Sequence, residues 1–167
     1  LYNTEKKAIS LKDFQSKSNV VILFFPLAFT RVCTQELCST RDEISFYNDV
    51  NATVLGISVD SIFSLAKFRE EENLSFDLLS DFNKDVAKNY HSLYDEFPFF
   101  GLKGVTKRSA FVVDKQGKIQ YAEILADASK VPNFEQIKEV LKKLNEWKGE
   151  TLCHFRPFSN KIARWWR

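Results

Sequence analysis

Short, continuous apolar runs alternate with amphipathic segments along the first part of the chain. The run Val20–Phe25 is apolar and mostly β-branched or aromatic, which predicts a strand covered on both faces. Between residues 31 and 49 apolar side chains recur on one helical face, which predicts a helix. A second apolar run over residues 53–59 predicts another buried strand. The order strand, helix, strand favours parallel pairing, because parallel neighbours need a crossover connection.

Shorter elements follow in the rest of the chain. The turn-forming residues Asp114–Gly117 lie between two apolar runs, which predicts a β-hairpin. The elements expected here are, in order, a helix from Asp60 or Ser61 through Phe68, a weak strand over 76–79, a short helix over 84–90, hairpin strands over 110–113 and 119–122, and an amphipathic helix over 134–147. This is the element order of an α/β protein with a thioredoxin-like fold, in which helices flank a central mixed β-sheet.

Length and composition fit one folded domain followed by a tail. The chain has 167 residues, of which 44% are hydrophobic and 28% charged, values near the globular average. We expect a thioredoxin-like domain over residues 1–147 and a basic, aromatic tail over 148–167. Residues 151–167 contain four basic side chains and no acidic one, whereas the whole chain has a net charge of only +2. So small a net charge gives no reason to expect a nucleic-acid partner.

Cysteine use and hydropathy bear on the cellular setting. Three cysteines are too few for a disulfide framework, so we expect a reducing compartment, the cytoplasm. The longest apolar run, residues 20–29, is about half as long as a membrane span and contains Pro26. We therefore expect no membrane span, and no targeting signal is visible.

Pro26, Thr30 and Cys33 form the most specific motif in the chain. They follow the first buried strand, and Cys33 falls in the first turn of the expected helix. Unpaired backbone N–H groups and the positive end of the helix dipole stabilise an anion there, so the position favours a thiolate. Thr30 is placed either to cap the helix or to direct its hydroxyl at the sulfur. An arbitrary buried cysteine is more often a small apolar residue than a nucleophile, and this context argues otherwise.

The motif resembles the active-site signature of the peroxiredoxins, in which a proline is followed by a threonine four residues later and a reactive cysteine three residues after that. The resemblance covers residues 5–147, and Arg108, before the strand of residues 109–114, matches the family's active-site arginine. The spacing of Cys33 and Cys38 is most similar to the bacterioferritin-comigratory (Q-type) group and its one-cysteine relatives. Relative to the family, we expect the N-terminal strand region to be truncated.

The resemblance implies a thiol peroxidase that uses no metal or organic cofactor. Its substrates would be hydrogen peroxide and organic hydroperoxides, attacked by Cys33, with Thr30, Arg108 and the Cys33 N–H as hydrogen-bond donors. Pro26 would restrict the loop. Cys33 would become a sulfenic acid, and Cys38 would resolve it as an intramolecular disulfide. The implied partner is thioredoxin or a glutaredoxin-like reductant, and the protein would be a monomer or a homodimer.

Helix geometry adds a condition to this scheme. Residues five apart on an ideal helix have Cα atoms about 8.7 Å apart. A disulfide requires Cα atoms within about 4.4–6.8 Å of one another. The helix carrying Cys33 and Cys38 must therefore unwind locally before the two sulfurs can join.

Several residues have alternative interpretations. Cys38 could be structural, in which case an external thiol would resolve Cys33. Arg108, beside Lys107, could be an ordinary surface residue at the start of a strand. Glu36 could support the site or only interact with the helix dipole. We expect Cys153, in the tail, to be an accessible bystander thiol.

Other functional classes fit the sequence less well. A thiol–disulfide oxidoreductase would carry Cys-x-x-Cys at the helix start, whereas this chain has four residues between its first two cysteines. A holdase or interaction module would use the fold and the aromatic tail without needing a reactive thiol. Structural zinc sites contain two cysteines close together in sequence, and this chain has no such pair. We therefore expect no zinc site from its cysteines and histidines, Cys33, Cys38, Cys153, His91 and His154.

Overall fold

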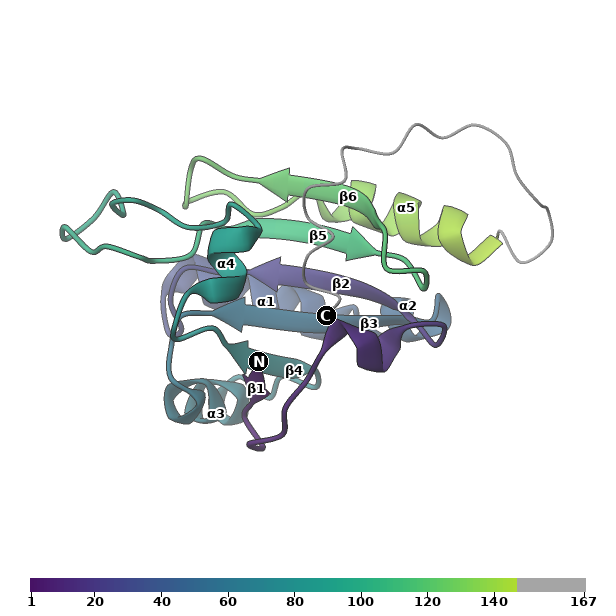
Figure 1. Ribbon diagram of the computed structural model, residues 1–167, viewed down its shortest axis with the longest axis horizontal. Coiled ribbons are helices and arrows are strands. Elements are labelled where there is room, and N and C mark those ends of the chain that lie inside the picture. The colour runs from purple at the N-terminus through teal and green to yellow at the C-terminus, as the bar shows by residue number, and fades with distance from the viewer. Residues whose placement is uncertain (147–167) are drawn as a thin grey trace.

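The computed structural model describes residues 1–146, which form a mixed β-sheet with helices on both faces (Figure 1). The expected tail, with Cys153 and His154, lies outside the described residues. The strands are β1 (Tyr2–Asn3), β2 (Asn19–Phe24), β3 (Ala52–Ser58), β4 (Asp77–Ser80), β5 (Ser109–Val113) and β6 (Ile119–Ile124). The helices are η1 (Leu11–Phe14), α1 (Arg31–Asp42), α2 (Ile44–Asp49), α3 (Ile62–Glu71), α4 (Asp85–Asn89) and α5 (Phe134–Glu146).

The sheet has the strand order β1-β4-β3-β2-β5-β6. β2 pairs in parallel with β3, and β3 pairs in parallel with β4. β5 pairs antiparallel with both β2 and β6. The expected α/β class with a central mixed sheet is therefore confirmed.

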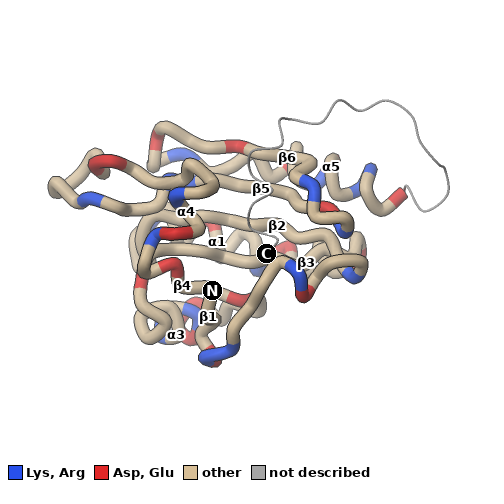
Figure 2. The backbone as a smooth tube through the Cα atoms, viewed as in Figure 1, with Lys and Arg blue, Asp and Glu red and all other residues tan. Residues whose placement is uncertain are grey.

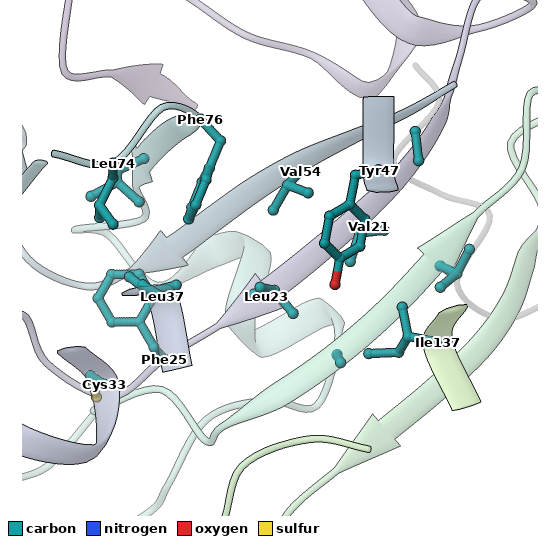
Figure 3. Close-up of a cluster of buried hydrophobic side chains, with 14 of the residues drawn as sticks. Val21, Leu23, Phe25, Cys33, Leu37, Tyr47, Val54, Leu74, Phe76 and Ile137 are labelled. Atoms are coloured by element: carbon teal, nitrogen blue, oxygen red, sulfur yellow. The ribbon is translucent and has the colours of Figure 1, made fainter. Parts of the chain in front are cut away.

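Alternate residues of β2 enter two separate cores, because successive side chains of a strand point to opposite faces. Val21 and Leu23 belong to the core beneath α1, α2, α3 and α5 (Figure 3). Val20 and Ile22 belong to the core on the opposite face, beneath α4 and η1. Burial on both faces explains why the β2 sequence is continuously apolar rather than alternating.

The helix expected over residues 31–49 is two helices. α1 ends at Asp42, and Glu43 leaves helical geometry with φ −104° and ψ 14° before α2 begins at Ile44. Leu37 of α1 and Tyr47 of α2 are both fully buried in the same core. The apolar positions therefore continue on the same face across the break, so the sequence predicted a single helix.

The other expected elements are present with boundaries shifted by up to three residues, the largest shift being at the end of α3. Ser61 is the N-cap of α3, and its side chain accepts a hydrogen bond from the Ser64 N–H. The hairpin turn is held by Asp114, whose side chain accepts from the N–H groups of Gln116 and Lys118. The short elements β1 and η1 were not predicted. Among the helices of the described part, none combines the length and the hydropathy needed to cross a membrane.

Candidate active site

Cys33 is the third residue of α1, directly after the loop that leaves β2. Its side chain is buried, with a relative exposure of 1%. The first hydrogen bond of the helical ladder is donated by the Thr34 N–H to the Thr30 carbonyl, at 2.9 Å. The N–H of Cys33 precedes this ladder, so it points from the helix end with the other free donors. Cys33 thus lies where a helix N-terminus stabilises an anion.

Arg108 lies beside Cys33 because β5 pairs with β2. Ser109 is in register with Phe24, so the residue before β5 reaches the loop that follows β2. Arg108 has a relative exposure of 1%, and its Nη2 donates to the Cys33 Sγ at 3.4 Å. The alternative of a surface arginine is therefore wrong. Most other charged residues lie on helices and loops, and the central strands β2 and β3 carry none (Figure 2).

Two groups, the Glu36 carboxylate and the Ala128 carbonyl, fix the orientation of the Arg108 guanidinium beside the sulfur. Its Nη1 is paired with the Glu36 carboxylate. Its Nη2 and Nε donate to the Ala128 carbonyl at 3.0 and 3.3 Å. A guanidinium is rigid and planar, so these contacts fix the direction of the donor that faces Cys33. Glu36 therefore supports the site in addition to lying in the first part of α1.

Burial raises the pKa of Glu36 to about 7, although the Arg108 charge acts in the opposite direction. Its Oε1 has no hydrogen-bond partner among the described residues. For Arg108, burial alone would lower the pKa, but the charges of Glu36 and Cys33 outweigh burial and raise it. Arg108 is therefore a permanent cation, and Glu36 titrates near neutrality.

This arrangement predicts a specific dependence of stability on pH. The Glu36 pKa rises from its ordinary 4.5 to about 7 on folding. A raised pKa gives stability that is fully present below pH 4.5 and is lost as pH rises through 7. We expect this group to lower the unfolding free energy by about 3 kcal/mol across that range, and Glu36→Gln to remove the slope. Urea unfolding of the unchanged protein and of Glu36→Gln between about pH 5 and pH 8 measures this loss of stability. If the unfolding free energies of the two proteins changed with pH in the same way, the raised pKa of Glu36 would be contradicted.

Thr30 occupies the N-cap position of α1, but its side chain makes neither contact that the sequence suggested. Its hydroxyl donates to the Leu27 carbonyl at 2.9 Å, and no side-chain capping bond is present at this end of α1. The capping alternative is therefore wrong. Pro26 is buried and lies in the loop between β2 and α1.

Two further residues that sequence reasoning missed position this loop. The Asp60 carboxylate accepts from the Ala28 N–H at 2.8 Å and from the Ser58 hydroxyl at 2.7 Å. The Thr106 hydroxyl donates to the Phe25 carbonyl at 2.6 Å. Both come from segments distant in sequence, so no local pattern could have revealed them.

Cys38 lies further along α1 and is not in contact with Cys33. Both thiols are free. Cys38 is half-buried, and its Sγ donates to the Glu72 carboxylate at 3.3 Å. Within residues 1–146, no three His, Cys, Asp or Glu side chains lie close enough together to hold a metal ion.

An apolar wall borders the site. Leu27 and Phe97 pack against Tyr94, Val105 and Ala128. Ala128 also supplies the carbonyl that binds Arg108, so the wall and the polar site share a residue. A buried thiol, a fixed cation and an apolar wall therefore lie together at the start of α1.

Two solved bacterial structures share this arrangement of elements. Peroxidoxin BcpB from Mycobacterium tuberculosis has a TM-score of 0.73 and 28% identity, over 89% of this chain and 92% of that one. A cysteine-to-serine mutant of Xylella fastidiosa PrxQ has a TM-score of 0.74 and 26% identity, over 87% of each chain.

Sequence comparison gives the family. The 2-Cys peroxiredoxin BAS1 of Spinacia oleracea is 31% identical over 131 residues, 74% of this chain and 47% of that protein, so the chain spans about half the length of this relative. A Mycobacterium tuberculosis protein with a provisional peroxiredoxin name is 38% identical over 117 residues, 69% of this chain and 73% of that protein. The AhpC/TSA family profile matches residues 1–122. Because this match covers well over half of the chain, the chain belongs to the AhpC/TSA family.

Proposed function

We propose that the protein is a thiol peroxidase that reduces hydrogen peroxide and organic hydroperoxides through Cys33. The observation that carries the proposal is the contact of 3.4 Å between the Arg108 Nη2 and the Cys33 Sγ, inside a buried site at the start of α1. A permanent cation at this distance favours a thiolate and can also bind an oxygen on which negative charge develops.

In the first step the Cys33 thiolate attacks one peroxide oxygen. A sulfur–oxygen bond forms and the oxygen–oxygen bond breaks, so that Cys33 is oxidised to a sulfenic acid. The electron pair of the broken bond leaves with the distal oxygen, which takes up a proton as water or an alcohol. Arg108 stabilises the developing charge, and the Cys33 N–H is a second donor on the same side.

In the second step Cys38 attacks the sulfenic acid. An S–S bond forms, the S–O bond breaks, and the departing hydroxide becomes water. Both cysteines lie on α1, where an ideal helix separates their Cα atoms by about 8.7 Å, so the helix must unwind between them. The absence of a side-chain cap at Thr30 supports a first turn that opens easily.

Thioredoxin or a glutaredoxin-like protein would reduce the disulfide and complete the cycle. The protein would work as a monomer or homodimer, and localisation to the cytoplasm rests on the cysteine content. Resolution by an external thiol is the second candidate route, favoured by the separation of Cys38 from Cys33 in the folded helix.

The oxidation product after one equivalent of hydrogen peroxide tests the proposal. After the remaining free thiols have been blocked, we expect mass spectrometry to find a Cys33–Cys38 disulfide. In Cys38→Ser we expect the same first oxidation, but with Cys33 trapped as sulfenic acid. A lasting sulfenic acid in the unchanged protein would instead support the external thiol. No oxidation of Cys33 in either protein would contradict the peroxidase proposal itself.

A further inference from the structure

The end of α3 holds two side chains of α1. Glu72, the C-cap of α3, accepts from the Cys38 Sγ at 3.3 Å through its side chain. Its main-chain carbonyl accepts from the Arg41 Nη1 at 2.6 Å. Cys38 and Arg41 are three residues apart, so they share one face of α1, and a single residue of α3 binds that face at two points.

Two further residues of this half of α1 are buried. Leu37 is fully buried, and Thr40 is buried with its hydroxyl bonded to the Glu36 carbonyl at 2.9 Å. Ser39 and Asp42, like Arg31 and Gln35 of the first turns, lie on the exposed side of α1. Cys38 therefore keeps its contact with Glu72 as long as α1 keeps its helical form.

From this contact we infer that Glu72 is a positioning residue that restrains Cys38, so that the resolving attack on Cys33 is slow until α1 unwinds and separates the thiol from the carboxylate. The inference rests on the proposed role of Cys38. Only a thiolate attacks a sulfenic acid efficiently, and a carboxylate at hydrogen-bond distance disfavours a second negative charge.

The other charges that face Cys38 come from its own helix. Burial and the hydrogen bond to Glu72 raise the pKa of the Cys38 thiol, and the Asp42 charge adds to this effect. Arg41 acts in the opposite direction, but its side chain is also paired with Asp42 at 2.7 Å. In the folded helix Cys38 is therefore a protonated thiol, whereas release from Glu72 makes it a better source of thiolate.

Glu72→Gln isolates the effect of the carboxylate. The amide can still accept from the thiol, and the main-chain carbonyl that Arg41 binds is unchanged, so the helix contact is retained. Glu71→Gln is the matched control, because it removes the same charge one residue earlier from a carboxylate paired with Lys67 at 3.6 Å. The amide is uncharged, so it accepts a weaker hydrogen bond from the thiol than the carboxylate does, and Cys38 leaves residue 72 more easily when α1 unwinds.

The experiment is a single turnover with one equivalent of hydrogen peroxide, blocked at intervals and analysed for the Cys33–Cys38 peptide. We expect Glu72→Gln to form the disulfide at least about threefold faster at pH 7, because its contact with Cys38 is weaker, and Glu71→Gln to match the unchanged protein. Equal or slower formation in Glu72→Gln would overturn the inference and leave the peroxidase proposal intact.

A second measurement does not depend on peroxide. In a Cys33→Ser background, the rate at which iodoacetamide alkylates Cys38, read from its own peptide, should reach half its maximum at lower pH when Glu72 is replaced by glutamine. An unchanged profile would overturn the inference. If the profile shifts but no disulfide forms in any variant containing Cys33, then the role of Cys38 in resolution is wrong, and the inference fails with it.

Discussion

Replacement of Cys33 by serine is expected to reduce peroxide consumption to the rate without enzyme. A serine hydroxyl remains protonated at neutral pH, and its oxygen cannot accept an oxygen atom as sulfur does. The two side chains are nearly the same size, so the core that contains Cys33 should keep its packing. Loss of hydrogen peroxide in the presence of a reductant system measures the effect.

Cys38→Ser is the matched control for this variant. It removes a thiol from the same helix, and we expect the first oxidation of Cys33 to proceed at an unchanged rate. Peroxide consumption by Cys33→Ser comparable to that of the unchanged protein would show that Cys33 is not the attacking sulfur.

Replacement of Arg108 by glutamine is expected to slow the reaction of Cys33 with peroxide by about 10²- to 10³-fold. Glutamine removes both the charge that stabilises the thiolate and the donor for the departing oxygen. It also leaves the buried Glu36 without its ion partner, which costs about 3–5 kcal/mol of stability when the carboxylate is ionised. Competition with a haem peroxidase for hydrogen peroxide gives the rate, and urea unfolding gives the stability.

Arg108→Lys separates charge from geometry. Lysine keeps the positive charge but not the planar fork that reaches Glu36, Ala128 and Cys33 together. We expect its rate to fall between those of glutamine and arginine. A folded Arg108→Gln protein that reacts as fast as the unchanged one would contradict the role given to Arg108.

The strands and helices could be predicted from the sequence because their signals are local. The continuous apolar run of β2, the hairpin turn at Asp114–Gly117 and the cap at Ser61 each depend on residues within a few positions. The break at Glu43 could not be predicted, since residues on both sides of it bury their apolar faces in the same core.

The site was predicted less completely, for a different physical reason. Cys33, Arg108 and Pro26 were identified through the family signature, which carries long-range information in the form of a motif. The contacts of Glu72 with Cys38, of Ala128 with Arg108 and of Asp60 with the loop after β2 arise only when the chain folds. Thr30 shows the limit of a motif, because its position was right and its hydroxyl partner was not.

The surroundings of Cys33 are assembled from distant parts of the chain. Arg108 lies 75 residues after Cys33, and Ala128 lies another 20 residues further on. A ribosome-bound chain that has not yet reached Arg108 therefore carries Cys33 without the guanidinium that contacts its sulfur, and so does a chain in which β5 has separated from β2. On the proposed function, reactivity toward peroxide would be acquired only on completion of the fold, and immature and damaged copies would be spared rapid oxidation of this sulfur.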